Sequence, residues 1–246
     1  MLSKAQIKYI KSLRTQKYRL ESRAFIAEGE KIACEWLSTN EPITHIVALE
    51  SWLRQHDTLL KNHPEASIYE IDEATLLSIS SLKSSQSALL VAKMPKPPLI
   101  FPQNGWSIAL DRLQDPGNMG TIIRIADWFG ISSIVCSPHC VDIYNPKVVQ
   151  AAMGGHLRVQ FLEADLEKYF EETSLPIYAA VLNGENLYQS QKSKDGVLLI
   201  GNESQGLTPN LVKLATNQVS IPRFGGAESL NAAVATGIIC SHLIQH

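Results

Sequence analysis

Short apolar segments alternate with helical patterns through the second half of the chain. Each apolar segment is four or five residues long and has no consistent polar face, so it predicts a strand that is buried on both sides. The predicted strands are residues 107–111, 133–136, 177–181, 197–200 and 218–221. The predicted helices are residues 117–129, 146–153, 209–215 and 229–244. Strands and helices in this order are typical of an α/β fold in which a parallel sheet has helices on both faces.

The first half of the chain has the pattern of a smaller α+β domain. Apolar positions at Ile7, Ile10 and Leu13 predict a short basic helix, and Asp72 is placed to cap a later one. A further helix is predicted at residues 31–37, and strands at residues 44–49, 68–71 and 88–92. Four prolines between residues 93 and 102 cannot continue a helix or a central strand. We therefore predict a domain at 1–94, a proline-rich linker at 95–103 and a domain at 104–246.

Composition describes an ordinary globular protein, but the charge is unevenly distributed. The whole chain of 246 residues has a net charge of -2 and a hydrophobic content of 45%. Its first 23 residues, in contrast, set seven basic side chains against Glu21 alone: Lys4, Lys8, Lys11, Arg14, Lys17, Arg19 and Arg23. This segment reads equally as an electrostatic footprint for nucleic-acid phosphates and as a solvated helix face.

The cysteines and the apolar content argue against a metal site and a membrane segment. Cys34, Cys136, Cys140 and Cys240 form no C-x-x-C pair, so we expect no zinc site and no other metal. The first four residues do not begin an apolar signal core, and no stretch reaches the ~18 apolar residues of a membrane helix. We expect a cytoplasmic protein with free thiols.

Three polar clusters follow predicted strands of the second half. They are Asn118-x-Gly120-x-x-x-Arg124, Gly201-Asn-Glu203-x-x-Gly206, and Ile221-Pro222 with Ser229-Leu-Asn231. Ligands of parallel α/β sheets bind beyond the carboxyl ends of the strands, so the three clusters are expected to meet in one site. The second cluster is not a phosphate-binding loop, because Leu207 stands where that motif needs lysine.

Purely structural roles also fit several of these residues. Asn118 could cap a helix while Arg124 pairs with Asp111 or Asp127 on the surface, and Glu203 could serve only as a cap or an ion-pair partner. Thr208 and Ser229 are natural helix caps as well. Asn231, expected at the second helical position, is less easily explained in this way, because asparagine is a poor interior residue of a helix.

The three clusters together resemble, in order and spacing, the motifs of the SpoU (TrmH) family of RNA 2'-O-ribose methyltransferases, in the SPOUT superfamily. The resemblance is strong over residues 104–246, although Gln150 and Ala152 stand where arginine and serine are common. Residues 8–37 are more weakly similar to the substrate-binding module that many of these enzymes carry. The resemblance implies that residues 1–94 form an RNA substrate-binding domain, and their charge makes the basic residues named above the candidates for contact with RNA.

The resemblance also implies the cofactor and the assembly. Members of the family bind S-adenosylmethionine in a deep trefoil knot, so Leu182, Gly201, Ile221 and Leu230 are expected to contact this cofactor. They are typically homodimers, in which Arg124 would act on RNA beside the partner's cofactor. The implied substrate is structured RNA, ribosomal RNA in preference to transfer RNA because of the additional N-terminal domain.

The implied reaction is methyl transfer to a ribose 2'-hydroxyl. A guanidinium group stays protonated in proteins, so we expect Arg124 to hold a phosphate and stabilise oxyanion charge. The proton could pass to water, or to Arg124 only if unusual desolvation and neighbouring cations made its guanidinium acidic. Asn118 would orient Arg124 or the ribose, Glu203 would fix the loops, and Ser229 and Asn231 would line the RNA side. Two other readings stay open: an inactive RNA-binding relative with this fold, and a nucleotide-dependent oxidoreductase, which the missing G-x-G-x-x-G argues against.

Overall fold

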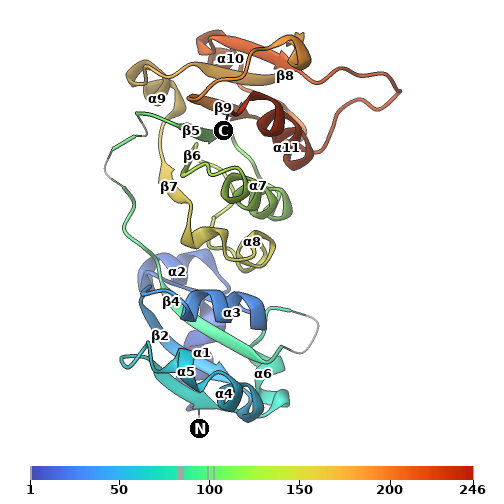
Figure 1. The fold of residues 1–246 in the computed structure, drawn as a ribbon. Coiled ribbons are helices and arrows are strands. Elements are labelled where there is room, and N and C mark those ends of the chain that lie inside the picture. Colours follow the sequence, from blue (N-terminus) through green and yellow to red (C-terminus); the bar gives the residue numbers. More distant parts are fainter. Residues whose placement is uncertain (1, 83–85, 99, 102, 246) are drawn as a thin grey trace. The chain divides into compact units, whose positions relative to one another are not determined.

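The computed structural model describes residues 2–82, 86–98, 100–101 and 103–245. By internal contacts the chain forms two compact units (Figure 1). The first unit contains residues 1–96 and 142–157, and the second contains residues 97–141 and 158–246. The domains and linker predicted from the sequence include residues 1, 83–85, 99, 102 and 246, which lie outside the described residues, and their boundaries stay a prediction.

The first unit is built on a four-stranded mixed sheet in the order β1-β4-β2-β3. Strand β4 is antiparallel to β1 and β2, whereas β3 runs parallel to β2. The strands are β1 (Ala24–Glu28), β2 (Ile43–Ala48), β3 (Ser67–Glu70) and β4 (Ala88–Lys93). The three strands predicted for this region are confirmed. Strand β1, which is buried at every position, was not predicted from the sequence.

Helices cover both faces of this sheet. Alternate residues of β1 therefore belong to two different apolar clusters, Ala24 and Ile26 to one and Phe25 and Ala27 to the other. The helices of the first unit are α1 (Lys4–Ser12), α2 (Gln16–Ser22), α3 (Glu30–Leu37), α4 (Glu50–Gln55), α5 (Asp57–Leu60), α6 (Glu73–Ile79) and α8 (Pro146–Ala152). The predicted helices correspond to α1, α3 and α6, and Asp72 caps α6 by accepting a hydrogen bond of 2.7 Å from the Thr75 amide. The sequence reading omitted α2, α4 and α5.

Residues 142–157 lie between two strands of the second unit in sequence but pack in the core of the first. Tyr144 and Val149 join its apolar cluster, and the ring centroids of Phe25 and Tyr144 are 4.7 Å apart. Arg19 forms a buried ion pair with Asp142 and donates a 2.8 Å hydrogen bond to the Leu13 carbonyl. Because Arg19 is only 1% exposed, it cannot contact a phosphate, which corrects its assignment to the RNA-binding residues.

The second unit contains a six-stranded sheet in the order β10-β8-β9-β5-β6-β7. Every neighbouring pair is parallel, so the predicted parallel sheet is confirmed. The strands are β5 (Trp106–Leu110), β6 (Ser133–Cys136), β7 (Gln160–Glu163), β8 (Ile177–Asn186), β9 (Gly196–Ile200) and β10 (Asn217–Ser220). Strand β7, which was not predicted, lies at the edge of the sheet and buries only Leu162, so its sequence contains no apolar run that would predict a strand.

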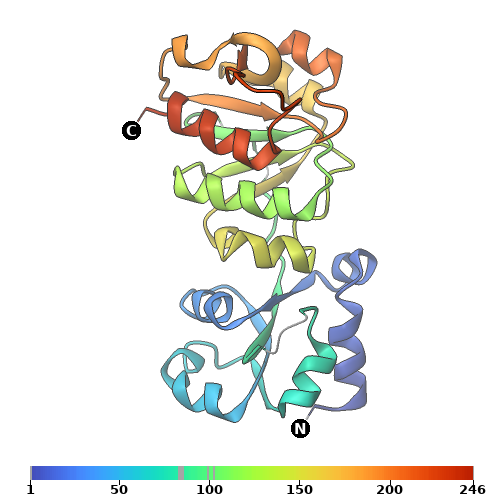
Figure 2. The same ribbon diagram turned by 90° about the vertical axis from the view of Figure 1, so that its right-hand side faces the viewer.

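Helices lie on both faces of this sheet, as predicted. On one face α9 (Leu166–Glu172) and α10 (Pro209–Leu214) pack with inward side chains of the central strands. On the other face α7 (Pro116–Trp128) and α11 (Ala232–Leu243) lie side by side (Figure 2). No helix in the described ranges is long and apolar enough to cross a membrane. The trefoil knot implied by the resemblance stays a prediction.

Candidate active site

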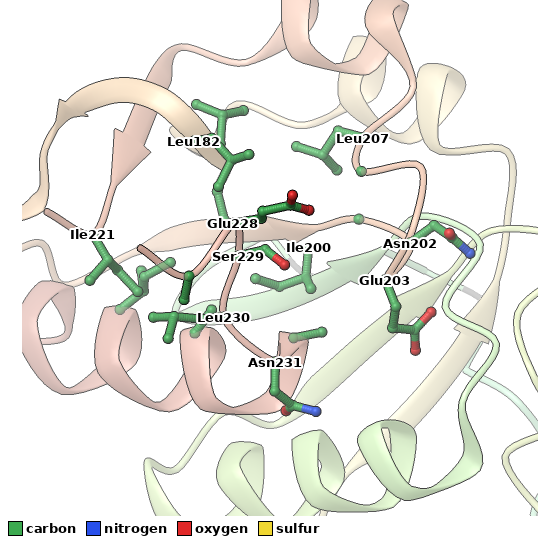
Figure 3. A pocket seen from close by; sticks show the side chains of 18 of the residues that line it. Leu182, Ile200, Asn202, Glu203, Leu207, Ile221, Glu228, Ser229, Leu230 and Asn231 are labelled. Carbon is green, nitrogen blue, oxygen red and sulfur yellow. The ribbon is translucent and has the colours of Figure 1, made fainter. Parts of the chain in front are cut away.

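A pocket of about 1030 Å³ opens at the carboxyl ends of β9 and β10, beside the middle of β8 (Figure 3). Four segments line it: the start of α7, the middle of β8, the loop after β9, and the loop from β10 into α11. Parallel strands place their carboxyl ends at one edge of a sheet, which is why segments far apart in sequence meet here. The pocket therefore combines all three polar clusters.

A chain of hydrogen bonds joins one asparagine or glutamate from each cluster. The Asn231 amide nitrogen donates to the Asn118 side-chain oxygen over 2.7 Å. The Asn118 amide nitrogen in turn donates to the Glu203 carboxylate over 3.0 Å. These hydrogen bonds fix the orientation of both side-chain amides, because the nitrogen and the oxygen of Asn118 each bond a different partner.

Glu203 fastens the loop after β9 to the start of α7. Its carboxylate accepts hydrogen bonds from the Asp115 amide at 3.1 Å and the Gln114 amide at 3.4 Å. Burial alone would raise the pKa of Glu203, but the hydrogen bonds from Asn118 and from backbone amides outweigh it and lower the pKa below its ordinary value. Glu203 is therefore anionic at neutral pH and connects two of the clusters.

The helix caps differ from those that the sequence suggested. Helix α7 is capped by Asp115, whose carboxylate accepts a 2.7 Å hydrogen bond from the backbone N–H of Asn118. Asn118 is therefore not the cap. Helix α11 begins at Ala232 and is capped by Asn231, not by Ser229. The Asn231 oxygen accepts from the amides of residues 233 and 234 at 3.0 and 3.2 Å. Asn231 thus has two functions, as helix cap and as donor to Asn118.

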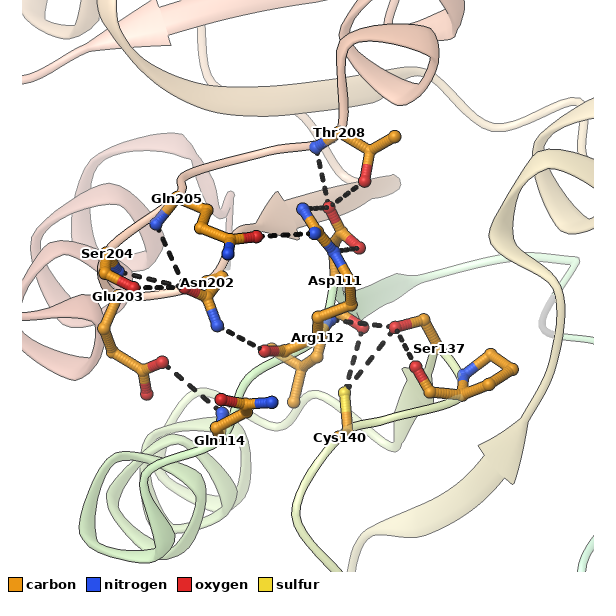
Figure 4. A network of polar contacts seen from close by, with 12 residues as sticks. Asp111, Arg112, Gln114, Ser137, Cys140, Asn202, Glu203, Ser204, Gln205 and Thr208 are labelled. Atoms are coloured by element: carbon orange, nitrogen blue, oxygen red, sulfur yellow. Dashed lines mark hydrogen bonds and ion pairs between the residues drawn. The ribbon is translucent and has the colours of Figure 1, made fainter.

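The loop after β9 closes tightly on itself (Figure 4). Asn202 and Gly206 exchange two backbone hydrogen bonds of 3.1 and 2.9 Å. A Cβ atom on Gly201 would lie 2.5 Å from the Gly206 carbonyl carbon, so only glycine fits at this position. The Asn202 side chain also donates to the Arg112 carbonyl over 2.8 Å. These contacts hold the loop in one conformation at the pocket wall.

Asp111 at the end of β5 supports the same loop and was not among the predicted site residues. Its buried carboxylate accepts from the Thr208 amide at 2.7 Å, the Thr208 hydroxyl at 2.8 Å and Arg112 Nε at 3.0 Å. Arg112 continues to the Gln205 side chain over 2.9 Å. Thr208 therefore bonds Asp111 instead of capping α10 with its side chain. The available signal was an acidic residue directly after a buried central strand.

Arg124 is exposed on α7 and does not line the pocket of its own chain. The surface pairs considered for it are absent: Asp111 binds Arg112, and Asp127 binds Arg158 at 2.7 Å. Nothing in the described ranges forms a hydrogen bond or ion pair with its guanidinium. The structure thus leaves Arg124 accessible, and its role stays a prediction.

A family model settles which proteins this chain is related to. The model of the SpoU rRNA Methylase family matches residues 105–241, which is more than half of the chain and includes the whole pocket. The chain belongs to this family. A second model, the MRM3-like substrate binding domain, matches residues 4–90. The resemblance recognised in the three clusters is therefore confirmed.

Relatives of the SpoU protein match over nearly its full length. The 23S rRNA (guanosine(2553)-2'-O)-methyltransferase RlmP of Bacillus subtilis is 29% identical, over 97% of this chain and 95% of that one. A TrmH-family protein of Porphyromonas gingivalis has a solved structure that is 36% identical, covers 99% of this chain and 98% of its own, and gives a TM-score of 0.88. An AdoMet-bound rRNA methyltransferase structure from Sinorhizobium meliloti is 31% identical, covers 98% and 95%, and gives a TM-score of 0.86.

The pocket of this SpoU protein suits the cofactor that the resemblance implies. Each of the four residues expected to contact S-adenosylmethionine lines it: Leu182, Gly201, Ile221 and Leu230. Leu182 is 73% exposed at the pocket wall, so its apolar surface is accessible to a ligand (Figure 3). Together with Ile200 and Leu207, these side chains offer an apolar surface for a flat ring beside a backbone held close by Gly201.

The basic residues predicted to bind RNA lie in the first unit, within the match to the substrate-binding domain. Six of the seven are exposed: Lys4, Lys8, Lys11, Arg14, Lys17 and Arg23. Three of them have protein partners: Arg14 donates to the Ser80 carbonyl at 2.5 Å, Arg23 donates to the Pro95 carbonyl at 3.2 Å, and Lys17 lies 3.9 Å from Glu21. In the described part of the chain, no three His, Cys, Asp or Glu side chains gather as metal ligands.

Proposed function

We propose that the protein transfers the methyl group of S-adenosylmethionine to a ribose 2'-hydroxyl of ribosomal RNA. The observation that carries this proposal is the pocket in which the three family motifs meet through Asn231, Asn118 and Glu203. The name of the full-length Bacillus relative favours ribosomal RNA as the substrate. The solved relative with AdoMet bound supports the cofactor.

The residues at the pocket would divide the work of binding and orientation. When bound, S-adenosylmethionine supplies an electrophilic methyl group on a positively charged sulfur. Leu182, Ile221 and Leu230 would hold its apolar part, and the backbone at Gly201 would approach it closely. Asn118 and Asn231 are held in fixed orientations, so they would present polar atoms to the ribose without a cost of reorganisation.

Arg124 is proposed to act on the RNA. A ribose hydroxyl is a weak acid, so its attack on a methyl group needs charge stabilisation near the oxygen. The guanidinium of Arg124 is cationic and accessible, and it would bind the neighbouring phosphate and stabilise the developing negative charge. The proton would pass to water.

The position of Arg124 outside its own pocket supports a homodimer in which it reaches the pocket of the partner subunit. The same family membership supports a trefoil knot around the pocket and a cytoplasmic location. In the first unit, Lys4, Lys8 and Lys11 repeat along one side of α1 and are proposed to contact phosphates. Sedimentation of a single monomeric species would rule out the shared site.

The variant Arg124→Ala tests the proposed chemistry. We expect methyl transfer from labelled S-adenosylmethionine to ribosomal RNA to fall at least about 100-fold, because the charge that stabilises the oxyanion is removed. The affinity for S-adenosylmethionine should change less than about twofold, since Arg124 does not line its own pocket and is proposed to contact the RNA, not the methyl donor, in the partner's pocket. Lys168→Ala on α9, which removes another exposed cation outside the pocket, is the control and should keep full activity.

Full activity of the Arg124 variant would refute its assigned role. Mapping 2'-O-methyl groups in ribosomal RNA from cells with and without the gene tests the reaction itself. We expect at least one site to lose its methyl group in the deletion strain. An unchanged map in ribosomal RNA, with a site lost in transfer RNA, would move the substrate assignment to transfer RNA.

A further inference from the structure

Glu228 lines the pocket but belongs to none of the hydrogen-bond networks described above. It lies in the loop between β10 and α11, directly before Ser229. Figure 3 shows its carboxylate pointing into the pocket, in the region between Leu182, Leu207 and Ser229. Glu228 is exposed, so water solvates this carboxylate as long as the pocket holds no ligand.

The other charged groups of the pocket already have protein partners. Asp115 accepts a hydrogen bond from the Asn118 amide, and Glu203 accepts from the Asn118 side chain. Arg223, the one cation of the lining, donates to the Ala227 carbonyl over 3.4 Å. Three carboxylates therefore stand against one guanidinium, and the pocket has an excess of negative charge.

Glu228 supplies the negative charge that is available to a ligand. No residue in the described ranges forms a hydrogen bond or ion pair with its carboxylate. In the free protein water solvates it, since the residue is exposed. A ligand that covers the apolar lining removes part of this water, and desolvation of an unpaired carboxylate is unfavourable unless the ligand brings positive charge.

We propose that Glu228 recognises the sulfonium charge of S-adenosylmethionine and so distinguishes the methyl donor from its demethylated product. This inference rests on the proposed function. The donor and S-adenosylhomocysteine share the adenosine, ammonium and carboxylate groups, and differ in the methyl group and the charge on sulfur. An anion facing that sulfur stabilises the donor complex and loses its attraction to the product, which favours exchange of product for donor after each reaction.

The expected selectivity is modest because the pocket is open to solvent. A single charge pair at such a site contributes about three- to tenfold in affinity. The substitution Glu228→Gln keeps the shape of the side chain and removes its charge. Glu172→Gln on α9 makes the same chemical change at an exposed position outside the pocket and serves as the matched control.

Isothermal titration of the full-length wild type and both variants with S-adenosylmethionine and S-adenosylhomocysteine tests the inference. We expect Glu228→Gln to weaken binding of the donor about three- to tenfold and binding of the product less than about twofold. Glu172→Gln should leave both affinities unchanged. The wild-type preference for the donor should also shrink in about 0.5 M salt, which screens the charge pair.

Equal weakening of both ligands by Glu228→Gln would overturn the inference, because the carboxylate would then act on a group that both share. Unchanged binding of both ligands would overturn it as well. If the wild type bound neither ligand, the proposed function itself would fail, and the inference with it. Thermal melting without ligand should be the same for the wild type and Glu228→Gln, so a general loss of folding is recognised separately.

Discussion

Two loops form opposite parts of the pocket, and they are held very differently. The loop at residues 201–208 is closed by the backbone bonds between Asn202 and Gly206, and is tied to Asp111 through Thr208. The loop at residues 222–230 has a single internal hydrogen bond, from Arg223 to the Ala227 carbonyl at 3.4 Å. Its side chains from residue 223 onward are exposed, and Phe224 is 97% exposed.

This difference separates preformed structure from adaptable structure within one site. The 201–208 loop loses its conformational entropy when the protein folds, so it presents its backbone to a cofactor without further ordering. The 222–230 loop has few contacts to hold it, so we expect it to keep more of that entropy in the free protein and to become ordered when a ligand binds. Substitutions in the first loop should therefore change stability, and those in the second should change binding alone.

The pair Gly201→Val and Gly225→Val sets the two loops against each other and has the largest expected effect. A side chain at Gly201 would collide with the Gly206 backbone, so we expect the free energy of unfolding to fall by about 2–3 kcal/mol and cofactor binding to be lost. A side chain at Gly225 meets nothing within 4 Å, so its cost should stay within about 0.5 kcal/mol. Urea denaturation measures both, and equal costs would contradict the comparison.

The substitution Asn231→Ala tests the residue that follows the 222–230 loop and caps α11. It removes the cap of α11 and leaves the Asn118 oxygen without its donor, so we expect a loss of about 1–2 kcal/mol. Ser229→Ala, two residues earlier, should cost less than about 0.5 kcal/mol because Ser229 caps nothing. If Ser229→Ala proved the more destabilising in thermal unfolding, the helix would begin earlier than the structure places it.

Much of the second unit could be predicted because its local pattern and its fold agree. Apolar runs such as residues 197–200 are buried on both faces of a parallel sheet, and the clusters follow them at the edge where ligands bind. Edge strand β7 and the caps were less predictable, because they depend on neighbours that the local sequence does not reveal. Ser229 and Asn231 are both good cap residues, and the hydrogen bond of Asn231 to the distant Asn118 side chain cannot be seen in the local sequence.

The first unit was harder to predict because part of its core comes from elsewhere in the chain. Tyr144 and Val149 pack against residues more than a hundred positions away, and Asp142 forms a buried ion pair with Arg19. No local signal distinguishes Arg19 from the exposed basic residues beside it, so charge counting alone assigned it to RNA. The roles of Arg124 and of the exposed lysines also depend on partners outside the chain, and they stay predictions.

The pH dependence of stability gives the smallest effect and concerns the fastening of the closed loop. Hydrogen bonds lower the pKa of Glu203 in the folded protein below its ordinary value of 4.5, so the unfolded chain binds the proton more readily. The stability from this carboxylate is therefore fully present above about pH 4.5 and is lost as the pH falls through the lower, folded-state pKa. Because Glu203 is exposed, we expect less than about 1 kcal/mol. Urea unfolding of the wild type and Glu203→Gln should show a stability difference that is constant near neutral pH and shrinks in acid; a difference independent of pH would mean that the ionised carboxylate does not fasten the 201–208 loop.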